Sequence, residues 1–366
     1  MTDGSDSVSA HLARRIGSAI EAQGGWLPFD TYMQMALYEP QLGYYARGER
    51  LFGRMPSSGS DFVTAPEMTP LFGRALAAQL RQALDACGSD LLVEFGAGSG
   101  ALAEVLLDTL GDAVGRYAIL DVSGGLRERQ QRRLARFGDR VCWWDAWPEQ
   151  PIRGVLLGNE VLDAMPVSLL HWDGSRWHER GVVNAGTGAF AFADRPTDLR
   201  PPVDGPFVPG TVTEVGRQGQ AFIASLADRL SCGVALFIDY GFPATEYYHP
   251  QRQGGTLMCH RGHRSDDDPL SDVGLKDITA HVDFSAIALA GQDAGLDVLG
   301  YTAQSHLLLN CGLSGLMETA TLPDRSMAAR LVSEHEMGEL FKAILFARGC
   351  HFDPLGFVAG DRTHRL

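Results

Sequence analysis

The chain of 366 residues is 45% hydrophobic and 21% charged, a composition that excludes long disordered or collagen-like segments and leaves ample length for a core. This length predicts about two domains, or one large α/β unit with insertions. The formal net charge of −14 argues against nucleic acid as the main partner, because phosphate backbones are bound chiefly by clustered Lys and Arg.

Residues 1–85 are predicted to be a largely helical segment with a loop that covers a pocket. Apolar residues at helical spacing predict helices over 10–22, 29–37 and 69–84. Residues 48–66 are rich in Gly, Ser and Pro, which predicts a mobile stretch between these helices. A second unit, 86–366, follows this segment.

Residues 86–366 are predicted to form an α/β domain around a doubly wound, mostly parallel sheet, because strands and helices alternate along them. Strands are expected at 91–95, 116–121, 140–144 and 154–158, with helices at 101–110 and 124–136. Beyond these we expect a helix at 213–230, a strand at 233–241, a helix at 283–294, a strand at 296–302, a helical run at 324–348 and a strand at 355–359.

Two insertions are expected in this domain, near 167–212 and 244–282. Short alternating runs around 167–172, 177–183 and 188–193, separated by glycine-containing turns, predict an inserted antiparallel ribbon. Residues 244–276 are polar and aperiodic, so we predict an irregular segment there.

Charge pattern and cysteine usage bear on partners and compartment. Five arginines at helical spacing predict a solvated helix face rather than a nucleic-acid site: Arg127, Arg129, Arg132, Arg133 and Arg136. The six cysteines form no C-x-x-C pair and indicate free thiols in a reducing compartment. With no leader, transit character or membrane span predicted, the expected location is the cytoplasm, without membrane insertion.

The strongest clue to function is a strand that breaks into a glycine-dense turn before a helix. Gly96, Gly98 and Gly100 let the backbone approach a ligand closely, and the helix that follows offers N–H groups to an anion. Glu94 precedes the turn and suits S-adenosylmethionine, whose ammonium it can meet while the turn meets the carboxylate. The same glycines also satisfy the dinucleotide fingerprint, so an NAD-dependent oxidoreductase is an alternative.

Polar residues at the ends of other strands extend this predicted site, since ligands bind at the carboxyl ends of strands in open α/β sheets. Asp121 is placed for ribose hydroxyls, Asp145 for the adenine amino group, and Asn159 beside the cofactor. Glu160 and Asp163 are the catalytic candidates, because a methyl-accepting guanidinium must be held by carboxylates. Alternatively, Asn159 caps a helix whose first turn carries the two acids.

A third catalytic candidate, Glu67, comes from the loop after residue 48 and is expected with Thr64 at the methyl-transfer pocket. Its alternative role is an N-terminal helix charge after Pro66. Asp239 and Tyr240, at the end of a later strand, are expected to face the same pocket.

Histidines give weaker signals. His260 and His263 lie near Cys259 and the acidic run 266–268, but their spacing fits no structural zinc site, so no metal is expected. His281 is either a base or a hydrogen-bonded structural group, and both roles stay open.

Separate blocks resemble the MidA-type family of S-adenosylmethionine-dependent methyltransferases over nearly the whole chain. They are residues 38–45, 61–67, 94–100, 159–164, 277–284 and 337–342. The resemblance implies a class I methyltransferase fold, which is Rossmann-like, and an acceptor arginine in a partner protein. The family's mitochondrial member is an assembly factor of respiratory complex I that dimethylates an arginine. An assembly chaperone that retains the cofactor fold is the alternative from another class of protein.

Overall fold

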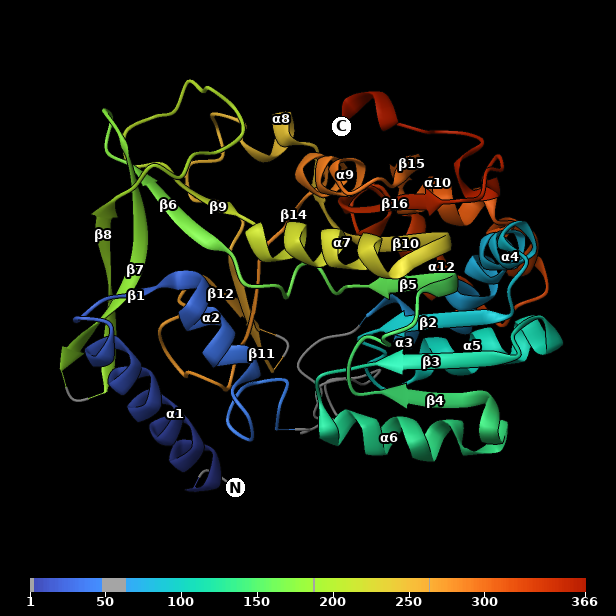
Figure 1. The fold of residues 1–366 in the computed structure, drawn as a ribbon, viewed down its shortest axis with the longest axis horizontal. Helices are drawn as coiled ribbons and strands as arrows, with labels where there is room; N and C mark the ends of the chain where they lie inside the picture. Colours follow the sequence, from blue (N-terminus) through green and yellow to red (C-terminus); the bar gives the residue numbers. More distant parts are fainter. Residues whose placement is uncertain (1–2, 48–63, 187, 263) are drawn as a thin grey trace.

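The computed structural model describes residues 3–47, 64–186, 188–262 and 264–366. They form two lobes, one around a large central sheet and the other around a smaller antiparallel sheet (Figure 1). None of the helices in these described ranges combines the length and the hydrophobicity that a membrane-spanning segment requires.

The central sheet has eight strands, in the order β15-β16-β10-β5-β2-β3-β4, with β14 (Val282–Asp283) paired to β10. Its strands are β2 (Leu91–Phe95), β3 (Arg116–Leu120), β4 (Val141–Trp144), β5 (Ile152–Asn159), β10 (Leu230–Phe242), β15 (Asp297–Ala303) and β16 (Phe341–Arg348). The pairs among β4, β3, β2, β5 and β10 are parallel, whereas β16 runs antiparallel to β10 and β15. The predicted α/β, mostly parallel sheet is therefore confirmed.

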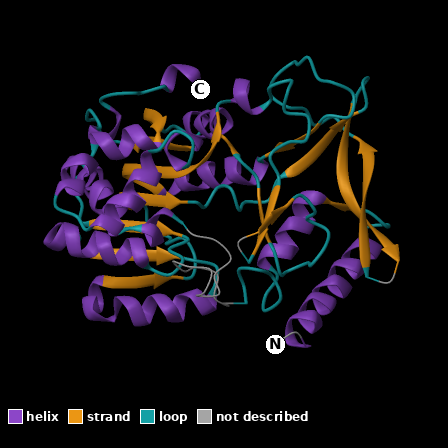
Figure 2. Ribbon diagram, turned by 180° about the vertical axis from the view of Figure 1, so that it is seen from behind, coloured by secondary structure: helices purple, strands orange, loops and turns teal. Residues whose placement is uncertain are grey.

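Helices cover both faces of this sheet, as opposite views show (Figures 1 and 2). One core cluster joins Leu92 to α4 (Pro70–Cys87), α5 (Ala101–Leu110), α10 (Gln304–Asn310), α11 (Leu313–Glu318) and α12 (Leu322–Val332). The next strand residue, Val93, belongs to the opposite cluster, with α7 (Arg217–Arg229) and α9 (Phe284–Asp293). Successive strand residues thus pack into two different cores, as expected for a sheet buried on both faces.

The second lobe contains the predicted antiparallel ribbon. Its strands are β1 (Leu27–Pro28), β6 (Ser168–Trp172), β7 (Trp177–Gly186), β8 (Ala189–Pro196) and β9 (Val212–Val215). Helices α1 (Asp3–Ala22) and α2 (Phe29–Tyr38) pack on it through residues such as Leu12 and Phe29, which are fully buried. The helices of residues 1–85 thus divide between the lobes, and the boundary at residue 85 stays a prediction.

Four sequence predictions about elements differ from the structure. The helical run 324–348 contains α12, α13 (Met337–Leu340) and the central strand β16. The helix 213–230 begins with strand β9, and the strand 355–359 is a short 3₁₀ turn, Leu355–Phe357. The irregular segment 244–276 contains α8 (Ala244–Tyr247) and the hairpin strands β11 (Met258–Arg261) and β12 (Arg264–Asp266), while β11 also pairs with β13 (Asp277–Thr279). Most of the predicted mobile stretch, 48–63, lies outside the described residues.

Candidate active site

A cavity of about 940 Å³ lies at the carboxyl ends of β2, β3, β5 and β10, and residues of both lobes line it. From the central sheet come Glu94, Asp121 and Glu160. From the second lobe comes Tyr45, and His281 comes from the segment between β13 (Asp277–Thr279) and β14. Most of the predicted site residues therefore share one cavity at the edge of the sheet where α/β proteins bind ligands.

The glycine turn between β2 and α5 has the backbone shape that the sequence predicted. Gly96, Gly98 and Gly100 have φ angles of 59°, 54° and 80°, in the left-handed region that side chains disfavour. The N–H of Gly96 donates to the carbonyl of Leu120, 3.0 Å away, which joins the turn to the end of β3. Helix α5 begins directly after Gly100, so its free N–H groups face the same cavity end.

Glu94 lies at the end of β2 with a side chain that is almost wholly buried. Its Oε2 accepts a hydrogen bond of 2.7 Å from the hydroxyl of Tyr117. Burial raises the pKa of Glu94 to about 8, and the charge of Asp121 adds to this effect, while the Tyr117 bond opposes it. A carboxyl group in this position ionises readily only beside a cation, which fits the ammonium of an amino-acid ligand.

Asp121 follows β3 and lines the same cavity as Glu94. Its Oδ1 accepts from the N–H of Ser123 at 3.0 Å, and its Oδ2 accepts from Nε2 of Gln130 at 2.8 Å. Burial raises the pKa of Asp121, and these hydrogen bonds oppose the rise. The carboxylate is thus fixed in orientation, as a ribose-binding group must be.

The segment after β5 turns sharply and brings Asn159, Glu160 and Asp163 to the cavity. Glu160 has a φ of 54°, and the Nδ2 of Asn159 donates to its Oε1 at 2.9 Å. Asp239 holds this turn from β10, since its Oδ2 accepts from the N–H groups of Val161, Leu162 and Asp163 at 3.0, 2.9 and 3.3 Å. No helix begins at Asn159, so the alternative helix-cap role is wrong.

These acids form an acidic cluster in which Asp163 and Asp239 are buried and Glu160 is partly buried. Burial raises the pKa of Glu160 to about 8, and the charge of Asp163 raises it further. Burial also raises the pKa of Asp163, against a hydrogen bond from the hydroxyl of Tyr240. In the described part of the chain, no basic side chain pairs with Glu160, Asp163 or Asp239, and Oδ1 of both Asn159 and Asp163 is buried without a hydrogen-bond partner.

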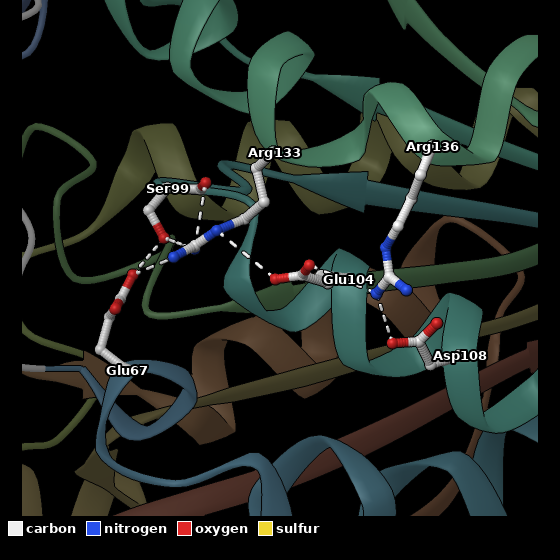
Figure 3. Close-up of polar contacts among 6 residues, drawn as sticks. All are labelled: Glu67, Ser99, Glu104, Asp108, Arg133 and Arg136. Carbon is white, nitrogen blue, oxygen red and sulfur yellow. Dashed lines mark hydrogen bonds and ion pairs between the residues drawn. The ribbon is translucent and has the colours of Figure 1, made fainter.

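Glu67 lies on the short helix α3 (Ala65–Met68) and is 7% exposed. It lines the cavity, as does Thr64, but its Oε1 accepts from the hydroxyl of Ser99 and lies 3.6 Å from Nη1 of Arg133 (Figure 3). The contacts with Ser99 and Arg133 therefore hold this carboxylate at the glycine turn. A catalytic role for Glu67 stays a prediction.

The remaining predicted residues divide between cavity and surroundings. Tyr240 and His281 line the cavity, and burial lowers the pKa of His281 to about 4, so its imidazole is neutral at pH 7. Asp239 does not line the cavity and serves as the anchor described above. Asp145 also lies outside the lining residues, with a side chain that is 84% exposed and paired with Arg127, a placement that does not support contact with adenine.

Sequence reasoning missed Gln130 and misjudged Arg133. Gln130 is wholly buried, and Arg133 reaches Ser99 inside the glycine turn, although the arginine series predicted a solvated helix face. Helical spacing alone carries no signal for either contact, because both depend on how the helix sits against the turn. Within the described ranges, no group of His, Cys, Asp and Glu gathers as metal ligands, and His263 falls outside them.

A turn that offers N–H groups to a carboxylate, beside a buried carboxyl that needs an ammonium, suits a donor with an amino-acid tail. Such a site on a sheet whose antiparallel strand, β16, lies next to the edge strand β15 is that of a class I S-adenosylmethionine-dependent methyltransferase. The chain belongs to the family described as "Putative S-adenosyl-L-methionine-dependent methyltransferase", whose model matches residues 73–302. S-adenosylmethionine is its cofactor, and the alternative of an NAD-dependent oxidoreductase is set aside.

Solved structures and curated relatives agree with this assignment. A Burkholderia thailandensis protein, solved bound to S-adenosyl-homocysteine, is 46% identical, with a TM-score of 0.95 over 100% of this chain and 99% of that one. The mitochondrial protein arginine methyltransferase NDUFAF7 of Danio rerio is 27% identical over 91% of this chain and 84% of its own length. The mitochondrial NDUFAF7 homologue of Caenorhabditis elegans is 25% identical over 96% of this chain and 92% of its own length.

Binding of S-adenosyl-homocysteine at pH 7 should release a proton. Glu94 is largely protonated in the free protein, because its pKa is raised to about 8, and the ligand's ammonium favours its ionised form. Affinity should therefore rise as the pH rises towards 8 and level off above it. Calorimetry in buffers of different ionisation enthalpy measures this release, which Glu94→Gln should remove. A binding enthalpy independent of buffer in the unaltered protein would contradict the assignment.

Proposed function

We propose that this chain transfers a methyl group from S-adenosylmethionine to an arginine side chain of a partner protein. The observation that carries the proposal is the acidic cluster after β5, in which buried Asp163 and partly buried Glu160 have no basic partner among the described residues. A cavity wall of this kind favours a cationic acceptor, because burying unpaired carboxylates is costly.

A guanidinium suits this wall better than an ammonium does. Its planar fork can donate to two carboxylates at once, and Glu160 and Asp163 lie three residues apart on one turn beside the free Oδ1 of Asn159. The rings of Tyr240 and Phe341, whose centroids are 5.2 Å apart, line the same cavity and offer aromatic surface to a flat cation.

In this reaction the donor supplies a methyl group on a sulfonium, and an N–C bond forms as the S–C bond breaks. Glu160 and Asp163 hold the guanidinium so that one nitrogen faces the methyl carbon, which lowers the barrier by positioning. The nitrogen loses a proton in the process. A bound guanidinium favours the ionised form of Glu160, and this carboxylate is suited to accept the proton because burial raises its pKa to about 8.

Two further parts of the proposal come from the relatives and from composition. The curated relatives named above are protein arginine methyltransferases, which supports a protein acceptor. The resemblance of the sequence to a family with a complex I assembly factor supports a partner among subunits of a respiratory complex. The cysteine pattern supports action in the cytoplasm.

The test is a comparison of the proteome of cells with and without this chain by mass spectrometry. We expect at least one protein whose arginine carries one or two methyl groups only when the chain is present. Re-expression of the unaltered chain should restore the modification. Methyl groups that depend on the chain but lie on another residue type would contradict the arginine assignment.

A further inference from the structure

Helix α6 (Gly124–Leu134) holds the glycine turn through hydrogen bonds to two of its carbonyl groups. Nε2 of Gln130 donates to the carbonyl of Gly98 at 3.0 Å. Nη1 of Arg133 donates to the carbonyl of Ser99 at 3.2 Å and also to the Ser99 hydroxyl (Figure 3). The two side chains lie one helical turn apart, so they hold consecutive carbonyls.

The turn needs such external contacts because its own residues fix it only in part, through the hydrogen bond of 2.8 Å from the N–H of Gly100 to the carbonyl of Ala97. Gly98 and Gly100, which flank Ser99, have no side chain and reach many backbone conformations at little cost. Fixing the carbonyls of Gly98 and Ser99 also fixes the peptide planes, and with them the direction of the N–H groups that follow. The N–H of Gly100 donates to the carbonyl of Ala97 at 2.8 Å, so the N–H of Ser99 is the one of the two that is available to an anionic ligand.

We propose that Gln130 and Arg133, here named the α6 clamp, are positioning residues that hold the glycine turn ready for the amino-acid tail of the cofactor. Glu67 is the third arm, since it accepts from the Ser99 hydroxyl and lies 3.6 Å from Arg133. Ser99 is 3% exposed, and both capacities of its hydroxyl are used, as donor to Glu67 and as acceptor from Arg133.

The two members of the clamp act on different parts of the cofactor. Arg133 contacts the turn, Glu67 and Glu104, so its effect is confined to the tail. Gln130 also donates to Oδ2 of Asp121 and is held in place by the indole of Trp143, whose Nε1 donates to its Oε1 at 3.0 Å. Gln130 therefore orients the ribose-binding carboxylate as well.

This difference sets the experiment, which needs no acceptor protein. Calorimetry measures the affinity for S-adenosyl-homocysteine and for methylthioadenosine, which lacks the amino-acid tail. Arg133→Gln should weaken binding of S-adenosyl-homocysteine about tenfold and change that of methylthioadenosine less than twofold. Gln130→Ala should weaken binding of both ligands.

Arg136→Gln is the matched control. It removes the same charge and the same kind of ion pair, because Arg136 pairs with Glu104 and Asp108, but it does not touch Ser99 (Figure 3). We expect less than a twofold change for both ligands. Thermal unfolding of each variant shows whether the protein is folded. The side chain of Arg133 is 30% exposed, so Arg133→Gln still tests the proposal if Gln130→Ala does not fold.

Three outcomes would overturn the proposal. They are unchanged binding of S-adenosyl-homocysteine by Arg133→Gln, an equal loss for both ligands in that variant, or an equal loss in Arg136→Gln. The same assay decides on Glu67: Glu67→Gln should weaken binding of S-adenosyl-homocysteine if it is the third arm, and unchanged affinity would remove it from the clamp. Because the readout is cofactor binding, these results are independent of whether the acceptor is arginine.

Discussion

Replacing Gly98 by valine should lower the affinity for S-adenosyl-homocysteine at least about a hundredfold, as measured by calorimetry. Gly98 has a φ of 54°, and a β-branched residue there carries a backbone strain of about 1–3 kcal/mol. The turn would relieve that strain by moving its N–H groups away from the cavity. The added side chain would also stand where the ligand must approach the backbone.

Gly88→Val separates this effect from general destabilisation. Gly88 has a φ of 60° and ends α4 on the surface, where an added Cβ meets nothing within 4 Å. This variant carries a similar strain far from the cavity, so it should lose stability and keep its affinity for the ligand. The cradle assignment would be contradicted by undiminished binding in Gly98→Val, or by an equal loss of affinity in both variants.

The parts of the fold that the sequence predicts well have local signals. The strand Leu91–Phe95 and the helix Ala101–Leu110 match the predicted ranges, because glycines interrupt an apolar run and a periodic pattern follows. The same holds for the ribbon strands β6 and β7, which are separated by a turn at Asp173-Gly174. In these cases a few neighbouring residues determine the element.

The central strand β16 shows where local signals fail. The residues Phe341–Arg348 are apolar except for Lys342 and Arg348 and show no alternation, and seven of the eight are buried. A run of this kind fits a buried helix segment as well as a buried strand, and only the neighbours decide between them. Here β10 and β15 flank it on both sides, so its backbone groups pair across strands that are distant in sequence.

The residues of the site likewise divide into those with a local sequence signal and those without one. Glu94, Asp121 and Glu160 were predicted because each follows a strand of the sheet, and the topology brings strand ends together. The anchoring role of Asp239 and the contacts of Gln130 were not predicted. Both depend on hydrogen bonds between distant segments, such as that from Leu162 to Asp239, which no local pattern encodes.

Glu160→Gln should abolish methyl transfer, with turnover lowered at least a hundredfold, while binding of S-adenosyl-homocysteine is retained. The substitution keeps the side-chain shape, the backbone conformation and an oxygen for the amide of Asn159. It removes the negative charge that holds the guanidinium, and losing one partner of a buried charge pair costs about 2–5 kcal/mol. Methyl incorporation into the acceptor found by the proteome comparison measures the loss.

Glu128→Gln is the control for charge, since Glu128 is 76% exposed and lies 3.9 Å from Arg132, outside the cavity. It should keep full turnover. If Glu160→Gln also keeps turnover, the acidic cluster is not the acceptor site.

The Glu160→Gln protein also separates an enzyme from an assembly chaperone that retains the cofactor fold. The variant keeps the fold and the cofactor cavity, so a function that rests on binding a partner should survive in cells that lack the methylated arginine. A function that rests on methyl transfer should be lost together with the modification. Because Glu160 contacts the cavity rather than the outer surface of either lobe, a loss of assembly in this variant points to the chemistry and not to docking.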